Sequence, residues 1–164
     1  MAELSVVVVN WNGRHLLADC LSSLRRQSLK NLEVILVDNG STDDSVAHVR
    51  HEYPEVRVLC LDRNYGFATA NNRGIEFSSG EFIALLNNDT VAAADWAARL
   101  LDAGKQSGAG IVASKVLLHA DPKLLDSAGD GMTTVGVAYK RGHREPSDRF
   151  AVMERVFGAS GCAM

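Results

Sequence analysis

The chain has 164 residues, of which 46% are hydrophobic and 23% charged, and its formal net charge is -3. This length and apolar content are typical of one globular domain with a substantial core, and they argue against a disordered chain. Because the charges are mixed in sign and form no basic stripe, the sequence predicts no nucleic-acid partner.

The three cysteines, Cys20, Cys60 and Cys162, are odd in number, far apart and set in apolar contexts. This usage favours reduced thiols in the core over a disulfide framework, and it is typical of a cytoplasmic protein. No apolar stretch approaches the roughly 18 residues that cross a bilayer. Peripheral association with the inner face of the membrane, through segments outside this sequence, stays open.

Strand and helix signals alternate through the first two-thirds of the chain. In chain order the sequence predicts a strand over 4–10, a helix over 13–27, a strand over 32–37, a helix ending near residue 50, a strand over 56–61, a helix over 68–77, a strand over 82–86, a helix over 96–103 and a strand over 109–113. The second helix has three candidate N-caps, Ser41, Thr42 and Asp43. Beyond residue 114 the pattern loosens, and the charged stretch YKRGHREPSDR indicates short strands joined by a mobile loop.

This alternation predicts an α/β fold. Strands separated by helices of this length form βαβ units with right-handed crossovers, so we expect a Rossmann-like, mostly parallel sheet with helices on both faces. The strands are continuous apolar runs, which is typical of strands buried on both sides.

Three of the predicted strands end in unusually polar residues, at 10–13, 38–43 and 87–89. In an open parallel sheet, ligands bind at the carboxyl ends of the strands. We therefore expect the three polar ends to converge on one edge, with Asp38 and Asp89 facing a shared cleft.

The residue types at these ends suggest how a nucleotide could be held. A carboxylate such as Asp38 can accept hydrogen bonds from a ribose or from the N–H of a uracil-like base. The turn NWNGRH contains a single glycine, so it is no dinucleotide fingerprint, and no P-loop motif is present. A divalent cation on Asp89 remains available to neutralise a diphosphate, with Asn87 and Asn88 ordering waters or sugar hydroxyls.

Four segments in order, SVVVVNWNG, EVILVDNGSTDDS, NYGFATANNRGI and FIALLNND, resemble family 2 glycosyltransferases of the GT-A fold, most closely the rhamnosyltransferase-like subgroup. The similarity covers residues 4–115 and resumes weakly at FGASGCAM. It implies transfer of a sugar, with inversion, from a nucleotide-diphosphate sugar to a hydroxyl of a sugar or glycolipid acceptor, such as a cell-surface polysaccharide. It also implies that residues 1–114 form the donor-binding half and that 115–164 begin an incomplete acceptor-side half.

The resemblance implies roles for individual residues as well. The donor-binding set is Val9, Asn10, Trp11, Asn12, Asp38, Asn39, Ser41, Asn64, Gly66, Asn71, Asn87 and Asn88. Asp89 matches the last carboxylate of the family's DxD motif and would bind Mg²⁺ or Mn²⁺. Because Asn87 stands at the first acidic position of that motif, we expect low metal affinity without nucleotide.

No general base can be assigned within the sequence. In the family this acid lies downstream of the FGASGCAM-like segment, so we expect it beyond Met164 and expect this chain to transfer sugar poorly alone.

Two other functions stay open at this point. One is a sugar-1-phosphate nucleotidyltransferase, although the Gly-rich, Lys/Arg-containing loop expected after its first strand is absent. The other is a non-catalytic nucleotide-sugar binding module.

Several of the candidate site residues also have a purely structural interpretation: Asp43 as a helix cap, Asn87 and Asn88 as turn formers, and Trp11 as a half-buried aromatic. The five histidines lack metal spacing, and most are expected at the surface.

Overall fold

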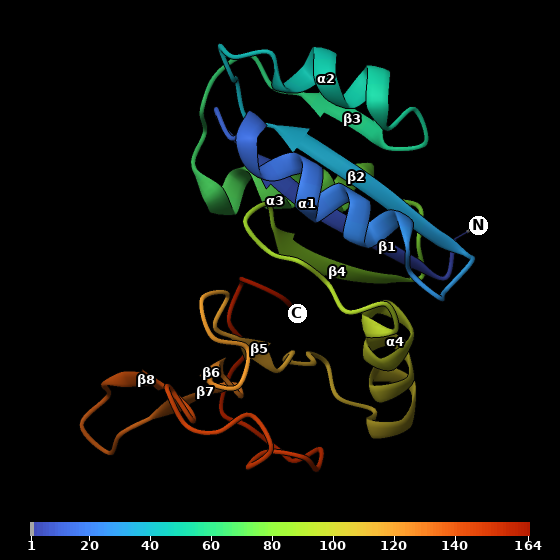
Figure 1. Ribbon diagram of the computed structural model, residues 1–164. Coiled ribbons are helices and arrows are strands. Elements are labelled where there is room, and N and C mark those ends of the chain that lie inside the picture. The colour runs from blue at the N-terminus through green and yellow to red at the C-terminus, as the bar shows by residue number, and fades with distance from the viewer. Residues whose placement is uncertain (1) are drawn as a thin grey trace.

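The computed structural model describes residues 2–164, and it is an α/β fold built on a four-stranded parallel sheet (Figure 1). The strands lie in the order β3-β2-β1-β4. The elements of this part are β1 (Leu4–Asn10), α1 (Arg14–Arg25), β2 (Leu32–Asp38), α2 (Ser45–Glu52), β3 (Arg57–Cys60), α3 (Phe67–Phe77), β4 (Phe82–Asn87) and α4 (Trp96–Ser107). The predicted fold class and the first eight predicted elements are confirmed.

The central strand β1 is buried on both faces, as its continuous apolar run predicts. Successive side chains of a strand point to opposite faces. Val6 and Val8 belong to the larger core cluster, which α1 and α2 cover, whereas Val7 packs in a second cluster with Ala70 of α3. Helices therefore lie on both faces of the sheet.

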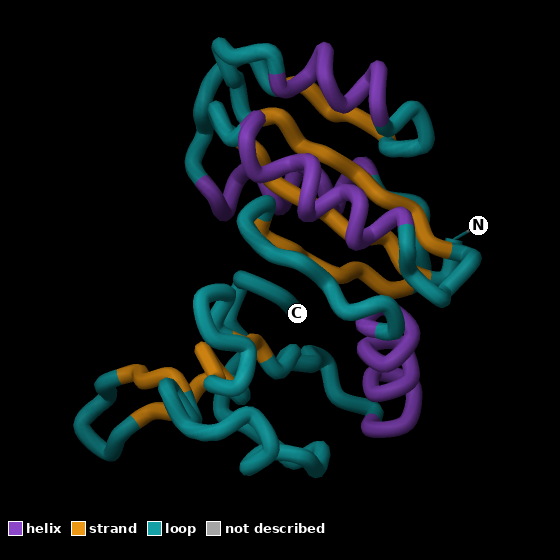
Figure 2. The backbone as a smooth tube through the Cα atoms, in the orientation of Figure 1, coloured by secondary structure: helices purple, strands orange, loops and turns teal. Residues whose placement is uncertain are grey.

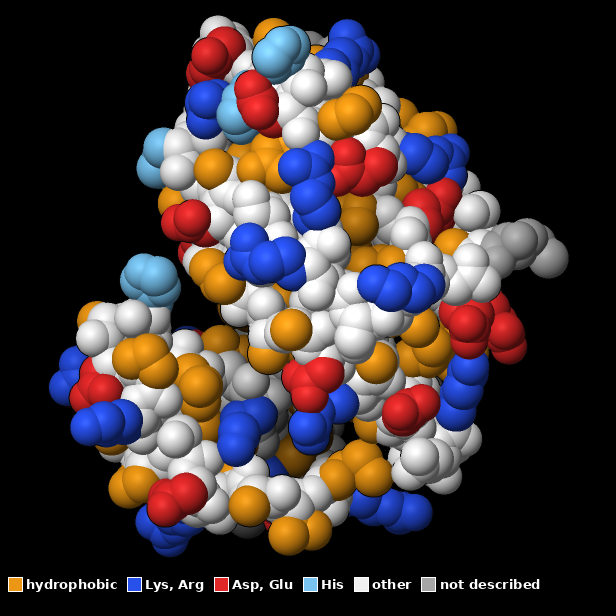
Figure 3. Space-filling view, turned by 45° about the vertical axis from the view of Figure 1, so that its right-hand side comes forward, with side chains coloured by type: hydrophobic (Ala, Val, Ile, Leu, Met, Phe, Trp, Pro, Cys, Tyr) orange, Lys and Arg blue, Asp and Glu red, His pale blue; other side chains and the backbone are white. Residues whose placement is uncertain are grey.

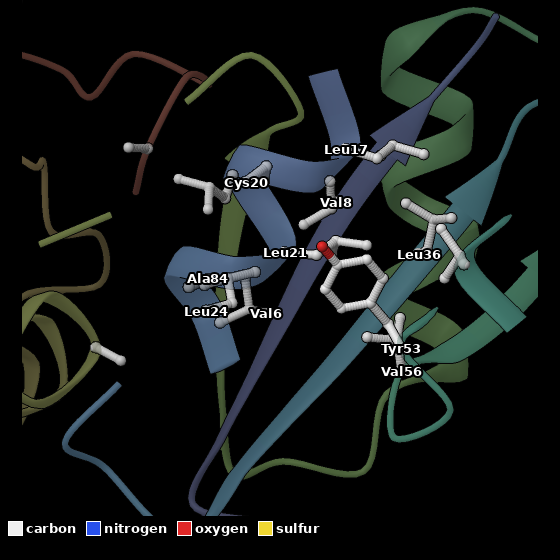
Figure 4. Packing of buried hydrophobic residues seen from close by; sticks show 14 of the residues in the cluster. Val6, Val8, Leu17, Cys20, Leu21, Leu24, Leu36, Tyr53, Val56 and Ala84 are labelled. Atoms are coloured by element: carbon white, nitrogen blue, oxygen red, sulfur yellow. The ribbon is translucent and has the colours of Figure 1, made fainter. Parts of the chain in front are cut away.

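The larger core cluster forms where α1 crosses the sheet (Figure 4). Helical spacing puts Leu17, Cys20, Leu21 and Leu24 on one buried side of α1. Burial of each leucine stabilises the fold by roughly 1.5–3 kcal/mol. This packing fixes the direction of α1, whose first turn lies next to the carboxyl end of β1.

On the opposite face, α3 approaches the sheet unusually closely at Gly74. A Cβ atom built there would lie 2.4 Å from Val7 Cγ1 and 2.8 Å from Val37 Cγ2. Only glycine allows this approach, which holds the start of α3 beside the ends of β1 and β2.

The predicted strand over 109–113 is wrong. This segment makes no strand ladder, because the free edge of β4 is occupied by residues 162–164, which run antiparallel to it. The amide of Leu85 donates to the carbonyl of Met164 at 2.7 Å, and the amide of Asn87 donates to the carbonyl of Cys162 at 2.9 Å.

The C-terminal part of the chain contains two short antiparallel pairs joined by loops (Figure 2). They are β5 (Val116–Leu117) with β6 (Leu125–Ser127), and β7 (Asp130–Met132) with β8 (Ala138–Lys140). Because residues 162–164 return to β4, this part lies beside the strand end that carries Asn87 to Asp89.

Two smaller expectations need correction. Helix α2 begins at Ser45 with Asp44 as its cap residue, one position after the last of the three predicted candidates. Cys20 is buried and Cys162 is half-buried, but Cys60 is exposed because it ends the short edge strand β3. No helix within residues 2–164 is long and apolar enough to span a membrane.

Candidate functional site at the carboxyl edge of the sheet

Asp38 is the centre of a hydrogen-bonded network at the end of β2. Its side chain is almost completely buried, and its Oδ1 atom accepts hydrogen bonds from Asn10 Nδ2 at 3.2 Å and from Ser41 Oγ at 2.6 Å. Its Oδ2 atom accepts a third bond from the amide of Ser41 at 3.0 Å. The carboxylate therefore fixes the loop that follows β2 against the end of β1.

Asn10 extends this network across β1 to β4. Its Oδ1 atom accepts a hydrogen bond from Asn88 Nδ2 at 2.9 Å. A Cβ atom at Gly13 would lie 2.5 Å from both of these amide side chains, so a glycine is required where the chain turns into α1. The side chains of Asp38, Asn10 and Asn88 thus join the ends of three adjacent strands in one row.

The loops after β1 and β2 are tied together above this row. Ser41 Oγ accepts a bond from the amide of Asn12 at 2.9 Å, and Asn12 Oδ1 accepts one from the amide of Thr42 at 2.8 Å. Asp43 accepts bonds from the amides of Arg14 and Ser45, at the first residues of α1 and α2. Burial opposes ionisation of Asp43, but the bonds from Ser45 and Arg14 outweigh it and lower the pKa of this carboxyl.

Asn39 organises the loop between β3 and α3. This buried side chain donates to Asn64 Oδ1 at 2.9 Å and accepts from the amide of Tyr65 at 2.9 Å. Asn64 Oδ1 also accepts the amide of Gly66 at 2.8 Å. Asn71, by contrast, is buried in α3 and donates to the carbonyl of Phe67, one turn earlier in the same helix.

The predicted donor-binding residues therefore fall into two groups by exposure. Those that are buried are Asn10, Asp38, Asn39 and Asn71. Those at least partly accessible are Val9, Trp11, Asn12, Ser41, Asn64, Gly66, Asn87 and Asn88. Trp11 is 56% exposed, so its ring is free to stack on a ligand.

Asp89 lies at the same edge in a different environment. It is exposed and lines an open pocket of about 140 Å³ together with His15, Leu16, Asp19, Thr90, Val91 and His119. Asp38 does not line this pocket, so the expected shared cleft is not the one that Asp89 faces. The pocket joins both parts of the chain, and Figure 3 shows the surface hollowed between them.

The Asp89 charge acts on the thiols nearby. Burial raises the pKa of Cys20 to about 12, and the negative charge of Asp89 adds to this effect. The same two causes, in the same order, raise the pKa of Cys162.

The residues around Asp89 suit a cation that takes most of its ligands from a bound molecule and water. No side chain within residues 2–164 bonds to the Asp89 carboxylate, and carboxylate oxygen is a ligand that Mg²⁺ and Mn²⁺ accept. In the described part of the chain no three His, Cys, Asp or Glu side chains converge closely enough to hold a metal among themselves. A metal here would depend on a diphosphate and water for its remaining ligands.

Two residues that line the pocket with Asp89, His15 and His119, were not predicted as site residues from the sequence. His15 and Asp19 lie one helical turn apart on α1, a spacing that the sequence displays. His119 lies in an irregular segment, and no motif or spacing in the sequence indicates a role for it.

The architecture and the polar edge define a class of protein: this is the GT-A fold of glycosyltransferases. Two solved structures show the likeness. S. aureus TarS in complex with UDP matches with a TM-score of 0.65 and 21% identity, over 74% of this chain and 37% of that one. The Pyrobaculum calidifontis mannosyltransferase PcManGT, in complex with GDP-Man and Mn²⁺, matches with a TM-score of 0.60 and 24% identity, over 85% of this chain and 44% of that one.

The chain belongs to glycosyl transferase family 2, whose family model matches residues 5–162. Among curated relatives, glycosyltransferase GlyG of Streptococcus pneumoniae is 38% identical over 95 residues, which are 56% of this chain and 32% of GlyG. The uncharacterized glycosyltransferase YibD of Escherichia coli is 37% identical over 90 residues, 53% of this chain and 26% of YibD. The chain spans about a quarter to a third of the length of these relatives.

Proposed function

We propose that this domain binds a nucleotide-diphosphate sugar at the carboxyl edge of its sheet and serves a glycosyltransferase that moves the sugar, with inversion, to an acceptor hydroxyl. One observation carries the proposal: Asp38, Asn10 and Asn88 hold the ends of three adjacent strands in one hydrogen-bonded row. Such a row fixes the ends of these strands at the edge where ligands of parallel α/β sheets bind.

In this proposal the nucleoside lies over the ends of β1 and β2. Trp11 stacks on the base, and the polar groups around Asn12 and Ser41 face the base and ribose. The loop at Asn64 and Gly66 borders the donor on the side of α3. Asn39 and Asn71, which are buried, shape this loop and helix from behind.

The diphosphate lies next to Asp89. A divalent cation held by this carboxylate would stabilise the negative charge that develops on the leaving nucleotide. The Mn²⁺ and GDP-Man named for PcManGT support this assignment by analogy. Asn88, bonded to Asn10, sets the position of the neighbouring Asp89 backbone.

The acceptor is a sugar or glycolipid hydroxyl, for which a general base is needed. A curated relative, the E. coli glucosyltransferase WfaP, is 30% identical over 91 residues and is named for a diphosphoundecaprenol-linked acceptor, which supports a glycolipid. The rhamnosyl-type donor and a base beyond Met164 stay predictions. A sugar-1-phosphate nucleotidyltransferase is not favoured, since the family match is to glycosyltransferases.

Calorimetry with UDP-, dTDP- and GDP-sugars, each with and without Mn²⁺, tests the proposal. Asn88→Ala should weaken donor binding about 5-fold or more, because removing this donor leaves Asn10 Oδ1 unpaired and frees the β4 end, at a cost of about 1–3 kcal/mol. Asn72→Ala, at an exposed position of α3, is the matched control and should bind as the wild type does. Absence of binding to every donor would refute the proposal.

A further inference from the structure

The hairpin formed by β7 and β8 presents apolar side chains to its surroundings. Every residue from 132 to 140 is exposed. The large apolar side chains among them are Met132, Val135, Val137 and Tyr139. The hairpin tip, residues 131–139, contains no charged side chain. Figure 1 shows this hairpin at the edge of the C-terminal part, pointing away from the parallel sheet. The tip is therefore accessible to a partner that accepts an uncharged, apolar surface.

The register of the strands gathers several of these side chains on one face. Tyr139 lies opposite Gly131 and its ring covers the glycine, since a Cβ atom added there would lie 2.4 Å from Tyr139 Cζ. Val137 shares the face of Tyr139 because it lies two positions earlier. On the other edge of β7, the bridge made by Gly158 brings in its neighbour Phe157, which is 69% exposed. The exposed apolar surface thus extends over three adjacent backbone segments.

We propose that the hairpin tip inserts into the interface of a lipid bilayer that contains anionic lipids. The choice of a bilayer over a protein partner rests on the proposed function, in which a glycolipid can be the acceptor. The inference goes beyond that function, because it assigns the membrane contact to residues of this chain. Tyr139, between the apolar tip and Lys140, would lie at the level of the headgroups, where aromatic rings are enriched.

The turn at the tip can leave water at low cost, because much of its backbone is bonded within the turn. The amide of Thr133 donates to the carbonyl of Val137 at 2.9 Å, and the amide of Gly136 donates to the carbonyl of Thr133 at 3.0 Å. The amide of Val137 donates to Thr133 Oγ1 at 3.0 Å. Unpaired amides are costly in an apolar environment, so these three bonds favour transfer of the tip into the membrane interface.

The distribution of charge favours an anionic surface on this side of the molecule. Residues 115–164 contain seven basic and six acidic side chains, a net charge of +1, and because the whole chain has -3, residues 1–114 carry -4. An anionic membrane would attract the C-terminal part and repel the rest, which directs the hairpin toward the lipid. Lys140 and Arg141 follow the tip but are paired with acids, whereas Arg144 is exposed and available to a lipid phosphate.

The experiment is cosedimentation of the 164-residue chain with vesicles of phosphatidylcholine, either pure or mixed with phosphatidylglycerol. The wild type should bind the mixed vesicles more tightly. Val135→Asp combined with Val137→Asp should lower that affinity by about 10-fold or more, since both changes place a charge in the inserted tip. Arg144→Gln should lower it by about 5-fold. Both valines are exposed, so urea unfolding of the double variant should match that of the wild type.

Val152→Asp is the matched control for the double variant. Val152 is 82% exposed, as Val135 is 83% exposed, but it lies outside the hairpin, so this variant should bind vesicles as the wild type does. An equal loss in Val152→Asp would overturn the assignment to the hairpin. Unchanged binding of the double variant would overturn it too.

Two further measurements separate the remaining outcomes. If the wild type sediments as a dimer in the absence of lipid and the double variant as a monomer, the tip is a contact between two copies and the lipid assignment is overturned. UDP binding is measured on the same proteins. If UDP binds but the vesicles do not, the inference fails and the proposed function stands. If the hairpin-dependent vesicle binding is found while no nucleotide binds, the membrane contact stands and the proposed function fails.

Discussion

Glu33, at the amino end of β2, should carry a large pH-dependent share of the fold's stability. Its carboxylate accepts hydrogen bonds from Ser5, from Arg57, and from both the amide and the hydroxyl of Ser79. Burial opposes ionisation of this side chain, which is 10% exposed, but these bonds outweigh the burial and lower its pKa from 4.5 to about 2. The bonds link β1, β2, β3 and the turn before β4.

The magnitude follows from linkage. A pKa lowered from 4.5 to about 2 corresponds to about 3.4 kcal/mol of stability, at about 1.36 kcal/mol per pH unit. Because the folded-state pKa is depressed, this contribution is complete above pH 4.5 and declines as the pH falls toward 2. At pH 3 about 1.4 kcal/mol of it should remain.

Glu33→Gln tests this expectation, since the amide keeps the shape but removes the charge. Urea unfolding should give a loss of about 3 kcal/mol at pH 7 that shrinks to about 1.4 kcal/mol at pH 3. Glu76→Gln is the matched control, because Glu76 is 65% exposed in its ion pair with Arg73 and should matter little. A loss for Glu33→Gln that is the same at both pH values would refute the reasoning.

Three further predictions concern single contacts. Gly40→Ala should destabilise the fold by about 2–4 kcal/mol in urea unfolding, since the residue has a φ of 75° and an added Cβ would lie 2.5 Å from the Arg63 backbone. Gly108→Ala has a similar φ of 60° but open space, so it should cost only about 1–2 kcal/mol, and equal losses would contradict the clash. With iodoacetamide and mass spectrometry, the exposed Cys60 should react first and Cys20, whose pKa burial raises to about 12, only on unfolding; early labelling of Cys20 would contradict its burial. Tyr53→Phe should cost about 1 kcal/mol in urea unfolding, because the hydroxyl bonds to two groups of α1, and an unchanged stability would show that water replaces those bonds.

The sheet could be predicted from the sequence because its central strand, β1, is buried on both faces and mostly apolar. A continuous apolar run such as LSVVVVN favours a buried strand whichever strands lie beside it. The strand can therefore be predicted without knowledge of distant contacts. The run over 109–113 looks equally suitable, yet it makes no strand, since the edge of β4 pairs with residues 162–164. Which segment takes an edge depends on pairing between residues far apart in the chain, and local pattern does not contain that information.

Cys60 illustrates a similar failure on a smaller scale. Its neighbours are apolar, which favours burial, but β3 is a short strand at the edge of the sheet and its last residue is exposed. The strand order decides this exposure, and the order could not be predicted from periodicity.

The candidate site was predictable in position but not in detail. Polar residues after buried strands indicated the edge at which Asn10, Asp38 and Asn88 do meet. The sequence could not indicate that Asp38 would be buried and already bonded across the sheet, because one of its donors, Asn10, lies at the end of another strand, β1. Nor could it place His119 beside Asp89, since that contact depends on how the C-terminal part returns to β4.

The contrast between the two aspartates restricts how a nucleotide can bind. A carboxylate offers about four lone-pair sites, and the Asp38 carboxylate already accepts three hydrogen bonds, so it has room for about one more. That is enough for one base N–H or one ribose hydroxyl, and Ser41 already donates to both oxygens of the carboxylate. Asp89 has no such restraint. A ligand that contacts both residues would therefore find about one free acceptor position at Asp38 and an unbonded carboxylate in an open pocket at Asp89.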